Sequence, residues 1–114
     1  MNEIYLFITT DGIAESFADY KKAEERFESE FRALEFAYIN GEAKEVMRLE
    51  NVVTWIEPFN GTVHTAVIRT LFPGRIVWYD GEQGVIRRIE NEKSIVLGME
   101  NGCVITINPE EIEY

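Results

Sequence analysis

The chain has 114 residues, of which 46% are hydrophobic and 12% aromatic, so it can bury a core, and intrinsic disorder is excluded. Its 21 acidic residues outnumber its 11 basic residues and give a formal net charge of −10. This excess argues against nonspecific binding to nucleic acid or to an anionic membrane, because both need a cationic surface.

Two strands are expected first, over residues 4–10 and 13–17, because both segments are rich in β-branched and aromatic residues. Asp11-Gly12 lies between them and is a strong signal for a tight hairpin, since both positions tolerate a positive φ. The chain therefore begins with an antiparallel pair.

The segment 19–40 predicts one long helix. Asp19 can accept hydrogen bonds from the free N–H groups of the first turn, and Asn40-Gly41 is suited to end a helix. The apolar residues recur at spacings of three and four and form one stripe; they are Tyr20, Ala23, Phe27, Phe31, Leu34 and Tyr38.

The opposite face of this helix is acidic. We take as candidate partner-binding residues Glu24, Glu25, Glu28, Glu35 and Phe36. The alternative for the glutamates is a face that is simply solvated, with Glu28 paired to Arg32 one turn away. The favoured alternative for Phe36 is burial under a loop or the second half of the chain.

After the helix, period-two alternation predicts strands over 42–56, with a break near Glu50-Asn51, and over 62–71. A short helix over 42–49 is the competing interpretation. We expect an α+β domain over residues 1–72, in which a ββα unit is followed by two further antiparallel strands packed on the long helix.

Phe72-Pro73-Gly74 marks a boundary, after which short strands alternate with turns. Strands are expected over 75–79, 85–90, 93–99 and 103–107, with DGEQG as the first turn and Asn101-Gly102 as a type I′ hairpin signal. One helical turn over 108–111 would precede a closing strand at 112–114.

The segments GRIVWYDGEQGVIRRIE and NGCVITINPEEIEY, within residues 74–114, resemble an SH3-like small β-barrel of the KOW and Tudor type. The resemblance covers about a third of the chain, and residues 1–72 resemble no family. Such barrels bind proteins, peptides or RNA. The segment lacks the basic stripe with interleaved aromatic residues of nucleic-acid-binding members. The binding site that the resemblance implies consists of Arg75, Trp78, Tyr79, Arg87 and Arg88.

No motif in the sequence indicates catalysis, a cofactor or a metal. The single histidine, His64, is expected on a surface or edge strand rather than as a base. Cys103 is expected to be a small buried residue, and its isolation excludes an internal disulfide and a cysteine zinc cluster. Trp55 and Trp78 are both expected in the core, since a tryptophan buries much area.

We expect a cytoplasmic protein, because one cysteine suits a reducing compartment and neither a signal peptide nor a membrane span is evident. The leading hypothesis is a non-enzymatic module that binds a basic protein surface. It has the profile of small phage or mobile-element inhibitors that occupy a nucleic-acid-binding groove. The alternatives are an adaptor whose C-terminal barrel binds a peptide or RNA, and an enzyme without a readable motif. The sequence leaves open whether the chain forms a homodimer.

Overall fold

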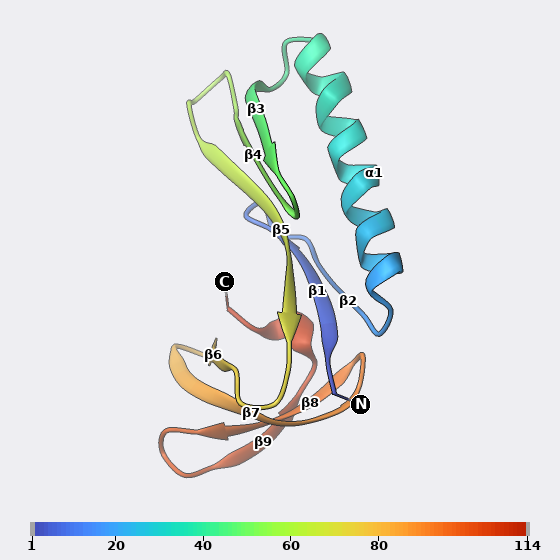
Figure 1. Ribbon diagram of the computed structural model, residues 1–114. Helices are drawn as coiled ribbons and strands as arrows, with labels where there is room; N and C mark the ends of the chain where they lie inside the picture. The colour runs from blue at the N-terminus through green and yellow to red at the C-terminus, as the bar shows by residue number, and fades with distance from the viewer. Residues whose placement is uncertain (1, 114) are drawn as a thin grey trace.

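The computed structural model describes residues 2–113, which form a mixed α+β fold with one helix and two antiparallel sheets in that range (Figure 1). The first sheet has the order β2-β1-β5-β4-β3, and the second has the order β6-β7-β8-β9. The elements are β1 (Ile4–Thr9), β2 (Ala14–Phe17), α1 (Tyr20–Ile39), β3 (Lys44–Leu49), β4 (Val52–Ile56), β5 (Val63–Leu71), β6 (Ile76–Tyr79), β7 (Glu82–Asn91), β8 (Ser94–Met99), β9 (Val104–Ile107) and the 3-10 turn η1 (Pro109–Glu111).

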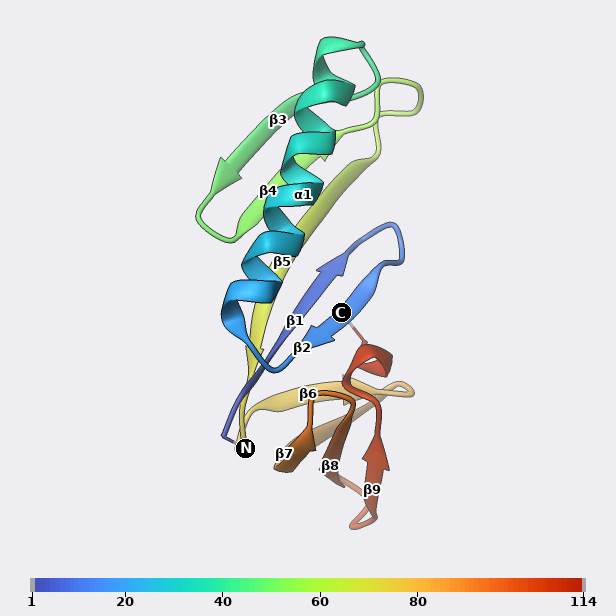
Figure 2. The ribbon, with the colours of Figure 1, turned by 90° about the vertical axis from the view of Figure 1, so that its right-hand side faces the viewer.

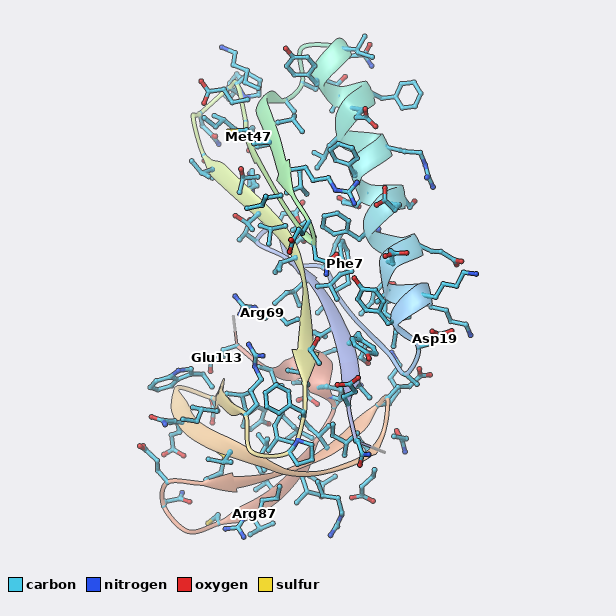
Figure 3. The ribbon with its side chains drawn as sticks, in the orientation of Figure 1. Phe7, Asp19, Met47, Arg69, Arg87 and Glu113 are labelled. Carbon is cyan, nitrogen blue, oxygen red and sulfur yellow. The ribbon has the colours of Figure 1, made fainter. Side chains whose placement is uncertain are left out.

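The helix begins and ends as predicted. The side chain of Asp19 accepts a hydrogen bond from the backbone N–H of Lys21 at 3.0 Å, and Asn40 ends the helix. From the apolar stripe, Ala23, Phe27 and Leu34 are buried against the first sheet. Figure 3 shows Asp19 at the start of α1 and Phe7 between β1 and the helix.

The segment between α1 and β5 differs from the prediction in one respect. The break near Glu50-Asn51 is a hairpin turn, with Glu50 at φ 52°, and it divides the segment into β3 and β4. Three strands therefore follow the helix instead of two, and the competing short helix over 42–49 is wrong. The alternation of Val46 against Met47 had indicated this strand correctly.

The central strands of the first sheet are buried on both faces. Phe7 on β1 and Ile68 on β5 pack against α1. Leu6, Ile8 and Leu71, on the opposite face of the same strands, pack against the second sheet. The β1–β5 pair is therefore covered by α1 on one face and by the second sheet on the other, which makes this part of the molecule a three-layer region. Figure 1 shows the second sheet beyond the N-terminal end of α1, around the lower ends of β1 and β5.

The second sheet is an open meander in residues 2–113 and does not close into the barrel that the resemblance implies. Glu113 forms one isolated bridge with Trp78 on β6, and Tyr114, the end of the expected closing strand, lies outside the described residues. The first turn is shorter than DGEQG and consists of Asp80-Gly81, both at positive φ, as a two-residue I′ turn requires. Asn101 has no positive φ, so the type I′ assignment there is wrong although the hairpin is present.

The expected boundary at Phe72-Pro73-Gly74 falls in the connection between β5 and β6. The segments on either side of it share one hydrophobic core. Leu6 and Leu71 from the first sheet lie in the same buried cluster as Ile86 and Leu97 from the second.

A polar clamp joins the two sheets beside this core. The carboxylate of Glu110, in η1, accepts from the backbone N–H and the hydroxyl of Ser16 on β2, both at 3.0 Å, and pairs with Lys93. Partial burial alone would raise the pKa of Glu110. The hydrogen bonds from Lys93 and Ser16 outweigh that effect and lower it.

Truncation of the shared core should destabilise both sheets together. In a Trp78→Phe background, Leu97→Ala should lower the free energy of unfolding by about 2–5 kcal/mol, because it empties a fully buried site. The fluorescence of Trp55, in the first sheet, should report this loss in urea, although Leu97 lies in the second. The exposed Val104→Ala should change stability by less than about 0.5 kcal/mol. An unchanged Trp55 midpoint would show that the sheets unfold separately.

The clamp should make stability depend on acid. Glu110→Gln should lower the free energy of unfolding by about 1–3 kcal/mol at neutral pH. Because the folded-state pKa is lowered, this contribution is present above the ordinary carboxyl value of about 4.3 and is lost as the pH falls through the folded value. Urea titrations at successive pH values should therefore show the two proteins converging in acid. The difference in free energy of unfolding between the wild type and the exposed control Glu100→Gln should not change with pH. If the difference for Glu110→Gln is equally constant, the ionic role of Glu110 is contradicted.

Candidate functional site

The structure gathers three of the four candidate glutamates of α1 on one flank of the helix. Glu24, Glu28 and Glu35 fall within about 40° of one another at 100° per residue, on the side nearest β3. Glu24 and Glu35 are exposed and Glu28 is half-buried. Glu25 is also exposed but lies on the back of the helix, away from the other three.

Arg48 on β3 lies at the centre of this flank. Its guanidinium binds Glu28 through both nitrogen–oxygen pairs, one of them at 3.0 Å, and stacks over the rings of Phe27 and Phe31 at 4.9 and 4.8 Å. The Glu28 hydrogen bonds raise the pKa of Arg48 against the opposing effect of its burial, and the charges of Glu24 and Glu35 raise it further.

Glu28 is consequently an anchored carboxylate. The hydrogen bonds from Arg48 lower its pKa despite some desolvation. The sequence predicted pairing with Arg32, four residues away, whereas the hydrogen-bonded partner comes from β3, 20 residues along the chain. This long-range pairing ties the acidic flank to the edge of the first sheet.

Phe36 is exposed, whereas we favoured its burial under a loop or the second half of the chain. Its side chain is 69% exposed on the back of α1, where it borders a shallow hollow with Arg32, Glu35 and Ile39. Neither the second sheet nor a described loop covers it. The patch interpretation of Phe36 therefore remains a hypothesis, on a different side of the helix from Arg48.

A groove separates the C-terminal half of α1 from β3. We call it the β3 groove; its volume is about 240 Å³ and it is lined by Phe31, Glu35, Tyr38, Ile39 and Val46. Figure 2 shows β3 at the outer edge of the first sheet, beside the helix. Tyr38 was expected on the packed stripe, but its side chain is 59% exposed and lines this groove instead.

Sequence reasoning named Phe31, Glu35 and Tyr38 but did not place them around a groove. Ile39 was absent from the apolar stripe, and its position on the flank of the helix was the available signal. The period-two alternation over residues 42–56 puts Met47 and Leu49 on one face of the predicted strand, but the sequence does not reveal that this face is uncovered. They are 69% and 78% exposed, and Figure 3 shows Met47 on the side of β3 away from α1.

The alternative site on the second sheet is divided in the structure. Trp78 is 51% exposed, which corrects its predicted burial, and lines a small hollow with Arg69 and Arg75. Arg75 also donates to the carbonyl of Thr70 at 2.9 Å. Tyr79 points to the opposite face of the strand and packs against the core.

The other two arginines lie elsewhere on that sheet. The guanidinium of Arg87, which is labelled in Figure 3, covers Gly98 so closely that an added Cβ would clash with Nε. It also borders an open hollow of about 520 Å³. Arg88 pairs with Glu90 at 3.7 Å. Arg87 and Trp78 therefore border separate hollows.

Trp55 is buried as expected. His64 and Cys103 are placed differently from the prediction. His64 lies on β5, which is a central strand, and stacks on Trp55; its nitrogens contact Glu57 at 3.2 Å and Thr10 at 3.3 Å. Cys103 is exposed at a hairpin, not buried.

Within residues 2–113, no three His, Cys, Asp or Glu side chains are grouped to hold a metal, and no helix has the length and apolarity to cross a membrane. Comparisons with family models, curated proteins and solved structures gave no significant match.

Proposed function

We propose that this chain is a non-enzymatic, cytoplasmic protein-binding module whose acidic helix flank engages a basic surface of a partner protein. The observation that carries the proposal is the exposure of Glu24 and Glu35 on the flank that Arg48 anchors. Neither of the two glutamates is a partner in the salt bridges formed within residues 2–113, although both lie close enough to Arg48 to raise its pKa. Their charges are therefore available to a partner.

The basic surface that we favour is a nucleic-acid-binding groove. Glu24 and Glu35, the two exposed carboxylates, lie about 16.5 Å apart along the axis at a rise of about 1.5 Å per residue. Both belong to one rigid helix, so their spacing is fixed before a partner binds. Carboxylates held in this way can replace phosphates in a groove built to neutralise them, as an inhibitor carried by a phage or mobile element would.

We further propose that residues 74–113 are a variant of the SH3-like module, appended to a ββα-based first half. The order β6-β7-β8-β9, the 3-10 turn and the return of Glu113 to Trp78 support this relationship. In this proposal the second sheet serves chiefly to support β1 and β5, which carry the helix.

Reversal of the acidic flank should abolish partner binding. Glu24→Lys with Glu35→Lys should weaken capture of basic proteins from lysate at least tenfold, because cationic groups would then face a cationic surface. Glu28 is left intact to preserve the Arg48 pair. Capture on the immobilised chain, read by mass spectrometry after nuclease treatment, measures the effect. The captured proteins should be released by salt and by competing duplex DNA.

The matched control is Glu82→Lys with Glu100→Lys, which makes the same change of net charge at exposed positions of the second sheet. It should retain the partner. If the two double variants bind equally, the helix flank is a solvated surface and the proposal fails.

The second candidate is an adaptor that binds RNA or a peptide on the second sheet. Exposed apolar side chains cross its outer face in one row, since Ile76 pairs with Val85, and Gly98 pairs with both Val85 and Val104. Arg87 lies beside this row. The overall charge of −10 weighs against RNA, so we rank this candidate below the first.

If the adaptor interpretation holds, labelled single-stranded RNA should bind with a steep salt dependence, and Arg87→Glu should weaken it at least tenfold. Lys22→Glu, an equal charge change on the helix, should have a smaller effect. Fluorescence anisotropy across a salt series makes the comparison. Absence of binding at low salt would remove the RNA form of this candidate.

A further inference from the structure

We propose that the outer edge of β3 receives an extended segment of the partner as an added strand, and that this segment carries lysine or arginine. The inference rests on the proposed function and specifies how the partner is held. Strand addition uses main-chain hydrogen bonds for affinity and side-chain pockets for specificity.

The two edges of the first sheet differ in whether their outward backbone groups are hydrogen-bonded. At the β2 edge, the backbone N–H of Ser16 is bound by Glu110 and that of Ala18 by Glu92, at 3.0 and 2.9 Å. These bonds close the β2 edge to another strand. At the other end, β3 pairs with β4 alone among residues 2–113. Its residues are exposed except for Val46 and the side chain of Arg48, which is half-buried against α1. An edge strand in this state presents unpaired N–H and C=O groups.

Apolar side chains lie exposed on both sides of this edge. On the helix side, Tyr38 and Ile39 form a wall of the β3 groove, with Val46 at its base. On the opposite side, Met47 and Leu49 are among the most exposed hydrophobic residues of the described chain. Alternate side chains of an added strand would contact both sets, because successive residues of a strand point to opposite faces.

The usable edge is short. A register shift between Lys44 and Met47, with Glu45 at φ 50°, interrupts the regular ladder of β3. From Met47 to Leu49 the register against β4 is regular. Bulges limit pairing at sheet edges, so we expect the added strand to pair with residues 46–49 and to extend past Glu35.

The acidic charge beside β3 favours a basic partner strand over a second copy of the chain. Two copies of the chain joined through β3 would bring together two acidic flanks, each with Glu24 and Glu35 exposed. The repulsion disfavours that pairing. The same carboxylates attract a basic segment, and Glu35 lies in the wall of the groove where a lysine or arginine beside β3 would reach it. A basic partner strand is therefore favoured over a second copy.

A random peptide-display library selected on the immobilised full chain tests this inference. Enriched peptides should alternate apolar residues with lysine or arginine. Methylation of alternate peptide nitrogens, which removes strand hydrogen bonds without changing charge, should weaken binding at least tenfold in fluorescence anisotropy. The amide resonances of residues 46–49 should shift on binding, and Glu35→Lys should weaken binding at least tenfold while Glu100→Lys should not.

Two results would overturn strand addition. One is that no peptide is enriched. The other is that enriched basic peptides tolerate nitrogen methylation or shift amides outside β3. In the second case, sensitivity to the Glu24 and Glu35 reversals would leave the acidic-surface function standing. If those reversals also fail to change capture of the natural partner, both proposals fall. If the same amide resonances of residues 46–49 shift as the concentration of the chain alone is raised, β3 joins two copies and the inference is replaced by a homodimer.

Discussion

Double burial of the β1–β5 pair is the constraint on which the rest of the structure depends. One face of this pair holds α1 through Phe7 and Ile68, and the other holds the second sheet through Leu6, Ile8 and Leu71. Strands covered on both sides need nearly continuous apolar sequence, and residues 4–8 are apolar at every position. The pair thereby places the acidic flank of α1 and the second sheet on opposite sides of one rigid layer.

Much of the fold could be predicted because its signals are local. The cap at Asp19, the apolar stripe of α1 and the strand over β3 depend on residues near in sequence. The cap and the strand are confirmed, and the stripe is buried or half-buried except at Tyr38. The failures concern what covers a surface. Phe36, Cys103 and Trp78 were all expected to be buried and are exposed, because hydrophobicity indicates a preference for burial but does not place a neighbouring element over the side chain.

The same limit applies to the candidate site. The sequence indicates that Glu24, Glu28 and Glu35 share a helix flank, but it does not indicate that Arg48 crosses from β3 to bind one of them. That contact divides the three carboxylates into one structural ion pair and two exposed charges. The open edge of β3 could not be predicted either, since the strand order is decided by long-range pairing. Closure of the opposite edge by Glu92 and Glu110 likewise joins residues 74 and 94 positions apart.

The uneven layering also implies that local stability is graded along the molecule, whose longest dimension is 49 Å. β1 and the C-terminal half of β5 are clamped between two layers, whereas β3 and β4 are covered by α1 on one face only. Amide hydrogens in the three-layer region should exchange only through global unfolding, while those of β3 can exchange through smaller openings. An edge that opens at low cost can adjust to the twist of an incoming chain. The ordering of that edge on binding then reduces the net affinity and speeds release.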